Sequence, residues 1–489
     1  MLEKGYLLHR FSRYRDGRCL LYMIGRLQNG QTFGIVEDRF QASFYIRASE
    51  KNMAEPVLAK TSLSLQPSSK TAMDGEELLS LTHADTHKLR RISDKLKEAK
   101  VRTYEADVKV EQQFLMDRRL RSLCEIEGNS IPGKGVDRLY KNPTLNPASC
   151  TVSLKSVIIE LFFDEEKLLA FAISDLPKKA ESGEVLIAAS DENEQDLLLK
   201  FRSALLEIDP DVICAWRVQQ DCFLPLRERF MFYNMLFDLG RHRPGQWYIE
   251  KGFRGKEFSI LQGRQLLDIE ELMDHTWERY SESTPESIIK DIFDEDFPSG
   301  SPENCASRSL LLGRLLAKKN LVDLTYSRSL LTGLSLERCW GSIASFEYLY
   351  IQELHKLNLA APSVGVDREL RGGSPGGLVL EPHAGIHQNI FVFDFKSLYP
   401  SIIRTFNIDP LAYNRARQKE KKGDVEDLIH LPNDVLMDRR EAILPATLER
   451  LFASREKAKE SGDELASFIY KILMNSFFGV LGTSGCRFA

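Results

Sequence analysis

The first third of the chain alternates short apolar runs with turn residues. The runs YLLHRF, CLLYMIG, FGIVED and ASFYIRA have the length of β-strands, and the basic amphipathic stretch THKLRRISDKLKEAKV that follows them predicts a helix. Two prolines and two asparagines in NPTLNPAS, at 142–149, predict a linker. We therefore expect a small α+β domain over residues 1–148.

The middle of the chain has longer apolar runs that alternate with one clear helical pattern. TVSLKSVIIELFF, KLLAFAIS and VICAWRV predict strands, and EQDLLLKFRSALLEIDPD predicts a helix that ends at Asp-Pro. The polar passage at 294–309 predicts an exposed loop, and SLLLGRLLAKKNLVDLTYSRSLL predicts a helix after it. This pattern is typical of an α/β domain with a central sheet, here over residues 149–332.

A third region, 333–489, contains a glycine-rich segment, an apolar strand and a helical hairpin. RGGSPGGLVL precedes the predicted strand NIFVFDF, and two helices are expected over 445–460 and 463–477. The sequence stops at GTSGCRFA without a polar tail, so we expect it to be part of a longer polypeptide.

Composition narrows the possible classes of function. The 66 Lys and Arg against 71 Asp and Glu give a net charge of −5, so a nucleic-acid binder of this kind must gather its basic residues locally. Eight cysteines without a CxxC pair exclude a zinc ribbon and predict reduced thiols. The N-terminus has no signal-peptide pattern, and no run of about 18 apolar residues occurs. We expect a cytoplasmic protein with no membrane segment.

The stretch IFVFDFKSLYPSIIRTFNIDP, at 390–410, carries the first candidate chemistry. An apolar strand delivers Asp394 at its end, and a turn with Ser397, Leu398 and Tyr399 follows. A carboxylate that leaves a buried strand is costly unless it is paired, hydrogen-bonded or bound to metal. Alone, the same aspartate also fits the cap of the next helix.

The predicted helical hairpin carries the second set of candidate functional residues. Arg455 and Lys459 are four residues apart and share one helix face, as do Lys471, Asn475 and Phe478 on the partner helix. Three cations from two helices could converge on a triphosphate. The alternative is that both helices present solvated charged faces. The segment NSFFG, at 475–479, would make a poor solvated surface, which weakens this alternative.

These residues resemble two motifs of the family B DNA polymerases. Asp394-Phe-Lys-Ser-Leu-Tyr-Pro-Ser-Ile is similar to motif A, and Lys471-x-x-x-Asn475-Ser-x-x-Gly479 is similar to motif B. Gly376 and Gly377 resemble the Gly-Gly element that joins the exonuclease and polymerase regions. The resemblance implies an α/β and α+β multidomain chain: an N-terminal α+β domain, a ribonuclease-H-like 3′–5′ exonuclease fold, and a partial palm with helical-hairpin fingers.

The resemblance also implies roles for individual residues. Asp394 would bridge two Mg²⁺ ions and the carbonyl of Phe395 would bind one of them, while Tyr399 would stack under the deoxyribose and select dNTPs. The implied contacts to the triphosphate and base come from Ser397, Leu398, Tyr399, Arg455, Lys459, Lys471 and Asn475. The implied contacts to primer–template DNA come from Gly376, Gly377, Phe478 and Gly479.

Two departures from the family pattern concern the polymerase site. The family carries further catalytic aspartates in a DTD motif downstream, called motif C, and no Asp-Thr-Asp occurs in this sequence. One carboxylate cannot hold two Mg²⁺ ions against water. We therefore expect polymerisation to need a C-terminal palm and thumb, on the same polypeptide or on a separate subunit, and a sliding clamp is a further possible partner. Motif B also has Phe478 where the family has tyrosine.

The third departure concerns proofreading. In the aligned exonuclease motifs, Ile159, Leu161 and Cys222 occupy carboxylate positions, and Asp323 alone is retained. Glu160 is one residue out of register, which on a strand means the opposite face. We expect a retained fold without exonuclease catalysis. The alternative is a shifted alignment in which Glu160, Asp221 and Asp323 converge.

The sequence therefore predicts part of a template-directed DNA polymerase without proofreading, working at the nucleoid. Two competing hypotheses are a catalytically inactive protein that binds primer–template DNA or a polymerase, and an exonuclease.

Overall fold

The structure, a computed structural model, describes residues 2–177, 183–191, 193–241, 248–251, 257–276, 278–366, 380–393, 395, 397–483 and 485–488. The chain forms two compact units, each assembled from separate stretches of sequence. Unit 1 comprises Met1–Arg15, Leu20–Phe40 and Arg118–Trp340, and unit 2 comprises Asp16–Cys19, Gln41–Asp117 and Gly341–Ala489. These units cut across the three consecutive ranges expected from the sequence, because residues 41–117 group with the C-terminal region.

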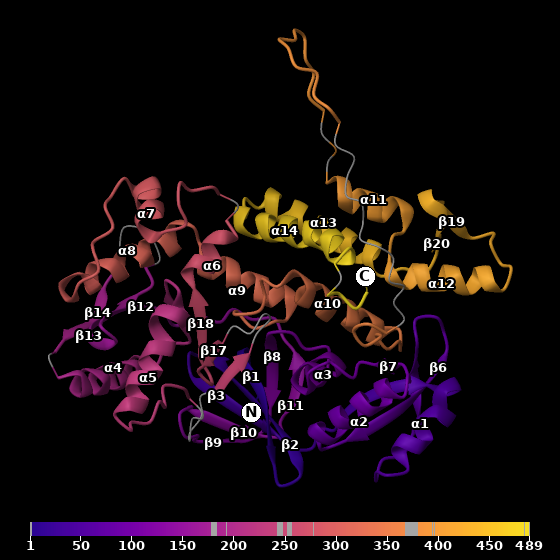
Figure 1. The fold of residues 1–489 in the computed structure, drawn as a ribbon, viewed down its shortest axis with the longest axis horizontal. Coiled ribbons are helices and arrows are strands. Elements are labelled where there is room, and N and C mark those ends of the chain that lie inside the picture. The colour runs from indigo at the N-terminus through magenta and orange to yellow at the C-terminus, as the bar shows by residue number, and fades with distance from the viewer. Residues whose placement is uncertain are drawn as a thin grey trace. The chain divides into compact units, whose positions relative to one another are not determined.

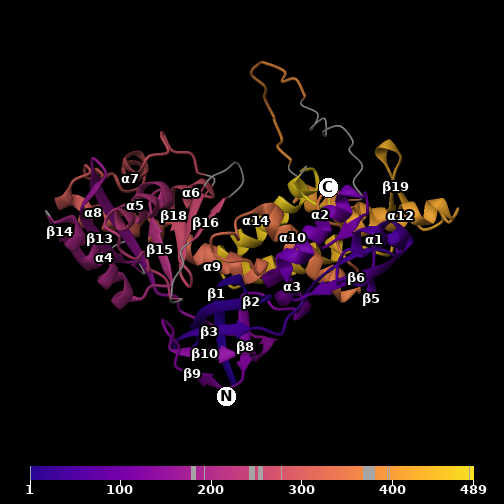
Figure 2. The ribbon, with the colours of Figure 1, turned by 60° about the horizontal axis from the view of Figure 1, so that its bottom comes forward.

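Unit 1 contains a seven-stranded sheet near the N-terminus (Figure 2). Its strand order is β11-β8-β1-β2-β3-β10-β9. The strands are β1 (Leu2–Arg15), β2 (Arg18–Leu27), β3 (Thr32–Glu37), β8 (Leu123–Glu127), β9 (Ser130–Ile131), β10 (Arg138–Lys141) and β11 (Thr144–Pro147). The linker expected at 142–149 is wrong where β11 pairs antiparallel with β8. β11 is an edge strand, and an edge tolerates Pro147 because no hydrogen bond is needed on its open side.

Unit 1 also contains a five-stranded sheet (Figure 1). Its order is β14-β13-β12-β15-β18, from β12 (Ser156–Asp164), β13 (Lys167–Asp175), β14 (Val185–Ser190), β15 (Val212–Ala215) and β18 (Gln265–Asp268). β13 runs antiparallel to both neighbours, whereas β12, β15 and β18 are parallel. Helices α4 (Glu194–Ile208) and α5 (Leu224–Phe232) cover one face with a large apolar core, and α8 (Cys305–Lys318) packs on the other.

The remaining elements of unit 1 refine two predictions. They are the hairpin β16 (Tyr248–Lys251) and β17 (Glu257–Ile260), and the helices α6 (Ile269–Asp274), α7 (Pro285–Phe293) and α9 (Leu321–Thr332). The loop expected at 294–309 is wrong at its end, because α8 begins at Cys305. The single helix expected after it is two helices, because Asn320 adopts a left-handed conformation with φ of 50°. Asparagine tolerates this conformation better than other side chains do.

Unit 2 contains a four-stranded sheet in the order β5-β6-β4-β7. Its strands are β4 (Ala42–Arg47), β5 (Gln66–Thr71), β6 (Glu77–His83) and β7 (Thr103–Tyr104), and its neighbouring helices are α1 (Lys51–Leu58), α2 (Thr86–Glu98), α3 (Val110–Asp117) and α10 (Ser342–Lys356). The segment after α10 returns to this sheet: Leu359 forms a bridge with Thr71, and Pro362 forms one with Tyr104. Residues that are more than 250 positions away in the sequence therefore complete the sheet.

The C-terminal part of unit 2 is mostly helical. It consists of α11 (Leu398–Phe406), α12 (Pro410–Lys421), β19 (Leu428–Leu431), β20 (Val435–Asp438), α13 (Leu444–Glu460) and α14 (Glu464–Leu481). The predicted helical hairpin is confirmed by α13 and α14, which pack against each other. By length and composition alone α14 also passes as a membrane span, as packed helices of other proteins do.

The strand expected at NIFVFDF is not formed by its described residues, 389–393 and 395. Ile390, Phe391, Val392 and Phe393 are between 66% and 90% exposed. A strand needs hydrogen-bonding neighbours, and the described part of the chain provides none for this segment. The apolar pattern therefore marks a surface without a partner here.

Candidate functional site

Two aromatic rings from different helices form the centre of the candidate site in unit 2. Tyr399, in the first turn of α11, stacks on Phe478 of α14 with ring centroids 4.1 Å apart and planes 17° apart. Both rings remain accessible, with exposures of 47% and 41%. An accessible flat surface of this kind can pack against a sugar or a base. The contact brings the predicted motif A and motif B residues together.

The start of α11 presents backbone donors beside this ring pair. Ser397 adopts a left-handed conformation with φ of 55°, and Leu398 opens the helix. The first N–H groups of a helix have no partner within the helix. The amides of Leu398 and Tyr399 are therefore free of partners within the helix, at the place where the family resemblance implies contacts to a triphosphate.

α14 has one packed face and one exposed face. Leu473, Met474 and Phe477 are buried, and Phe477 packs edge-on against Phe346 of α10 with centroids 5.3 Å apart. Lys471, Asn475 and Phe478 are exposed, as their spacing predicts for one shared face. Because Phe478 also carries the contact to Tyr399, this exposed face is the one that borders α11.

The cations of α13 differ from each other. Arg455 is half-buried, and its buried Nε atom has no hydrogen-bond partner among the described residues. In an antiparallel hairpin Arg455 and Lys471 are at similar heights, roughly 3 Å apart along the helix axes at 1.5 Å per residue. Lys459 instead pairs with Glu456 at 2.9 Å, an exposed contact that contributes little. Arg455 and Lys471 are thus the better placed candidates for an anion.

Several predicted residues fall outside what can be placed. Asp394, Gly376 and Gly377 lie outside the described residues. Phe395 is described and is 75% exposed. No group of three or more His, Cys, Asp or Glu side chains in the described part of the chain could hold a metal ion.

A buried carboxylate that the sequence analysis missed fixes the helices around the ring pair. Asp409 caps α12 and accepts hydrogen bonds from Leu411 and Ala412, and it also accepts one from Leu444 at the start of α13. The Tyr350 hydroxyl of α10 donates to the same carboxylate at 3.0 Å. Burial raises the pKa of Asp409 above its usual value, although these donors oppose the shift. The Asp-Pro pair at 409–410 is a sequence signal for the start of a helix and could have predicted this cap.

In unit 1, Glu160 and the two predicted exonuclease positions of β12 lie on opposite faces of the strand. Ile159 is fully buried in the core under α4 and α5, and Leu161 packs against the same core. Glu160 points to the other face, where its carboxylate accepts a hydrogen bond from Arg308 of α8. Alternation along the strand produces this split.

The other two positions lie on different elements. Cys222 is buried in a π-helical turn, Val218–Phe223, where Asp221 is its neighbour. Asp323 lies in the first turn of α9. Lys319, just after α8, pairs with Glu278 at 2.5 Å.

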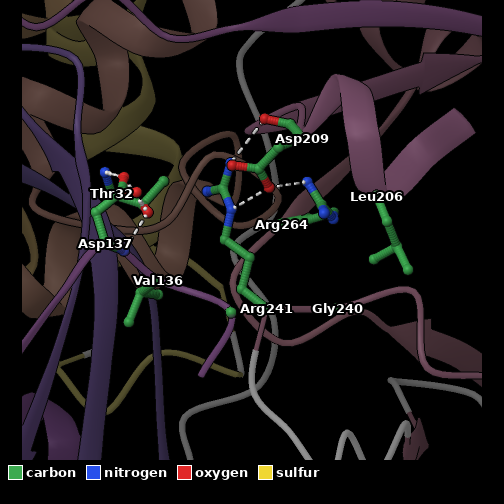
Figure 3. A pocket seen from close by; sticks show the side chains of 9 residues that line it. Thr32, Val136, Asp137, Leu206, Asp209, Gly240, Arg241 and Arg264 are labelled. Atoms are coloured by element: carbon green, nitrogen blue, oxygen red, sulfur yellow. Dashed lines mark hydrogen bonds and ion pairs between the residues drawn. The ribbon is translucent and has the colours of Figure 1, made fainter. Parts of the chain in front are cut away.

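A separate cavity of about 330 Å³ lies in unit 1, lined by Thr32 of β3, Leu206 of α4 and residues of the connecting segments (Figure 3). Its charged lining consists of Arg241, Arg264, Asp209 and Asp137. Arg241 and Arg264 are 1% exposed and both pair with Asp209. These contacts already satisfy the guanidinium groups, so the cavity wall is an ion-pair network that supports the fold.

Comparison with known proteins finds similar sequences among DNA polymerases. The model "DNA polymerase family B" matches residues 341–489, the region that holds the ring pair. DNA polymerase II of Escherichia coli is 29% identical over 438 residues, which are 82% of this chain and 54% of that protein. The chain is therefore similar to family B DNA polymerases.

Further relatives that match the chain are archaeal. A DNA polymerase of Thermococcus gorgonarius is 25% identical over 81% of the chain and 53% of its own length. The solved family B DNA polymerase of Pyrobaculum calidifontis has the same fold, with a TM-score of 0.78 at 17% identity over 99% of this chain and 69% of its own. The chain spans about half the length of the curated relatives that it matches.

Proposed function

We propose that this chain is the N-terminal and central part of a DNA-directed DNA polymerase that adds dNTPs to a primer 3′ end. The observation that carries the proposal is the stack of Tyr399 on Phe478 beside the exposed Lys471 and Asn475. This arrangement joins a flat apolar surface to a cation and an amide within one face. A nucleoside triphosphate needs the same combination.

Each described residue has a proposed part in positioning the substrate. The Tyr399 ring packs under the deoxyribose, where a 2′-hydroxyl would collide with it. Arg455 and Lys471 bind the triphosphate, and the amides at the start of α11 donate to its outer phosphates. Asn475 faces the base, while Phe478 and Gly479 lie along the DNA. Binding of this kind accounts for the positioning share of catalysis.

Mg²⁺ is the metal that the family uses. The set of carboxylate ligands that would hold it is incomplete in the sequence of this chain. The described residues contain no group that could hold an ion, and Asp394 is the one palm carboxylate that the sequence predicts. Bound Mg²⁺ would supply charge stabilisation for the attacking and leaving oxygens. We propose that the missing ligands come from a C-terminal palm and thumb part.

The exposed apolar segment supports this need for another part. Phe391 and Phe393 are 80% and 90% exposed, in a segment without strand partners among the described residues. Contiguous exposed apolar side chains usually mark an interaction site. A palm strand from the C-terminal part would pair with this segment and cover its rings.

The five-stranded sheet of unit 1 supports a ribonuclease-H-like exonuclease fold without proofreading. Its strand order, with the second strand antiparallel to the rest, is the order of that fold. Ile159 and Leu161 face the apolar core, and Cys222 has a thiol in place of a carboxylate. We propose that the site lost its metals and its activity.

The second candidate is a protein that binds primer–template DNA, or a polymerase, without chemistry. The absence of a metal-holding group among the described residues favours it for this chain alone. Both candidates place the protein at the nucleoid, where a sliding clamp is a possible further partner.

One assay separates the candidates. A labelled primer–template is incubated with dNTPs, Mg²⁺ and the chain, with or without the product of the downstream reading frame. Extension only with that product supports the polymerase, a shortened primer supports a nuclease, and a shifted band alone supports the binder. In the extending mixture Asp394→Ala abolishes the product, whereas the control Asp424→Ala, between α12 and β19, does not. Extension by Asp394→Ala would remove the proposed role of that residue.

A further inference from the structure

A single carboxylate in unit 2 holds the beginnings of two helices. Asp409 is 1% exposed and lies between the end of α11 and the start of α12. Its Oδ1 accepts hydrogen bonds from the amides of Leu411 at 2.8 Å and Ala412 at 3.0 Å, at the start of α12. Its Oδ2 accepts from the amides of Ile443 at 3.2 Å and Leu444 at 2.8 Å, at the start of α13. Each oxygen atom therefore caps a different helix.

The second of these helices depends on Asp409 for its cap. α12 follows Asp409 directly, and a residue that caps the helix after it is a local feature of the sequence. Leu444 of α13 is 35 positions away from Asp409, and the N-cap residue of that helix, Ile443, has no side-chain oxygen. The contact to Asp409 therefore ties the start of α13 to the end of α11.

The carboxylate of Asp409 is buried without a cation among the described residues. Its partners are the amides at the two helix starts and the hydroxyl of Tyr350 on α10, which lies 3.0 Å from both carboxylate oxygens. Helix N-termini carry partial positive charge, and two of them converge on this one group. Because a buried charge is costly without such donors, movement of α13 away from Asp409 is unfavourable. The arrangement therefore favours one fixed position of α13.

α13 connects this cap to the candidate anion site. Arg455 is 11 residues beyond Leu444. At about 1.5 Å per residue it lies roughly 16 Å along the helix, so a tilt of about 5° at the start of α13 would displace Arg455 by about 1.4 Å. An error of about 1 Å is enough to weaken a positioned contact strongly. The ion pair that joins α11 to α13, Arg404 with Glu449 at 3.2 Å, is exposed and resists such a tilt little.

We propose that Asp409 is a positioning residue for nucleotide binding. By holding the start of α13 to the end of α11, its carboxylate sets where Arg455 meets the triphosphate. Asp409 itself touches no substrate in this proposal and takes no part in the chemical step. The inference rests on the proposed polymerase function for its ligand, whereas the link between Asp409 and α13 is a property of unit 2 alone.

The variant Asp409→Asn separates the two caps. An asparagine side chain has one oxygen atom, and its NH₂ group would face amide donors instead of accepting from them. Asparagine is a good cap for the helix that follows it, so α12 should keep its cap while α13 loses its own. Amide hydrogen exchange of the full chain, measured by mass spectrometry, should therefore become about tenfold faster at the start of α13 and stay unchanged at the start of α12.

The consequence for the nucleotide is measured by primer extension with the chain and the product of the downstream reading frame. We expect Asp409→Asn to raise the KM for dNTP about tenfold while kcat falls by less than about twofold, because substrate binding is lost and the reacting groups are unchanged. In an Arg455→Ala background the same change should add nothing, because the group that Asp409 positions is gone. A general structural defect would instead add to the loss caused by Arg455→Ala.

Two further variants complete the comparison. Tyr350→Phe removes only the hydroxyl that donates to the carboxylate, and it should raise the KM about threefold even if Asp409→Asn does not fold. Asp463→Asn is the matched control, because Asp463 is exposed and caps α14 alone, accepting from Ala466 at 2.9 Å. It should leave both hydrogen exchange and the KM as in wild type.

The proposal is overturned if Asp409→Asn loosens both helices equally, if its KM stays at the wild-type value, or if its effect adds fully to that of Arg455→Ala. If Asp409→Asn does not fold, an unchanged KM for Tyr350→Phe overturns it. A wild-type mixture that extends no primer would instead contradict the proposed function, and hydrogen exchange alone would then decide whether Asp409 holds α13.

Discussion

Asp268 is a helix cap whose negative charge is costly where it sits. It caps α6, accepting from the amide of Glu270 at 3.0 Å, and it also accepts from the amide of Arg217 at 3.1 Å. Burial, with the charge of Glu271, raises its pKa from 3.8 to about 6. The carboxylate oxygen of Asp268 therefore stabilises the fold by accepting hydrogen bonds, whereas its negative charge destabilises the fold.

This shift predicts a pH-dependent gain for Asp268→Asn. Between about pH 4 and about pH 6 the folded state holds a proton that the unfolded state has lost, so wild-type stability falls as the pH rises through this window and stays lower above it. Asparagine keeps the accepting oxygen without the charge. Calorimetry should show the variant about 1–2 kcal/mol more stable at pH 7.5, with no gain near pH 4.

The control for this experiment is Asp294→Asn, at the end of α7, whose side chain is 94% exposed. It should change stability by less than about 0.5 kcal/mol at both pH values. A gain for Asp268→Asn that is equal at pH 4 and pH 7.5 would contradict the charge explanation.

Single residues also show what the sequence can and cannot reveal. The shared exposed face of Lys471, Asn475 and Phe478 followed from helical spacing alone. The partner of Glu160 did not, because Arg308 is distant in sequence and lies in a passage whose composition predicts a loop. Local patterns report which face a side chain is on, whereas the group opposite depends on tertiary packing.

At the scale of elements, α14 combines a packed face with an open one. Gly479 lies on the open side, where an added Cβ would meet no atom within 4 Å. A glycine in the middle of a helix is unfavourable by about 0.5–1 kcal/mol relative to alanine. The helix therefore has a residue of low helix propensity at a position where the described structure has space for a larger side chain.

Gly479→Ala should raise stability by about 0.5–1 kcal/mol and still reduce primer extension by the completed enzyme. The reason is the proposed approach of DNA to this face, where a methyl group would intrude. Unfolding and extension are measured on the same preparation. Gly482→Ala, just after the helix, is the control and should extend as wild type does; full extension by Gly479→Ala would place the DNA elsewhere.

Elements were predicted best where one pattern runs through them. Three strands of the five-stranded sheet, β12, β13 and β15, and the α13–α14 hairpin formed where expected, because apolar spacing is a local property. β11 was missed because the prolines at 143 and 147 suggested a linker, and the edge position of the strand tolerates Pro147. The segment at 390–393 failed for the opposite reason: its apolar pattern is strand-like, but the described residues give it no partner.

At the scale of the whole molecule, that segment predicts self-association of the chain. Phe391 and Phe393 are nearly fully exposed, and exposed apolar strands tend to pair with one another. Phe391→Ser/Phe393→Ser should lower the apparent mass in light scattering without changing the unfolding midpoint, because both rings are exposed and neither is part of a core.

The same double variant should also bind the C-terminal part more weakly. Buried Phe346→Ser serves as the contrast, because it should lower the midpoint and increase aggregation. Equal scattering by wild type and the double serine variant would show that the segment is not a contact surface.

The closure of the four-stranded sheet by Leu359 and Pro362 has a consequence for synthesis. Residues 41–117 emerge from the ribosome long before those two residues do, so the nascent chain must carry an unfinished sheet while all of 118–340 is translated. A gene interrupted near codon 340 would therefore yield two products, neither of which holds a complete unit 2. Any natural division of this polypeptide into separately encoded pieces is expected to avoid that point.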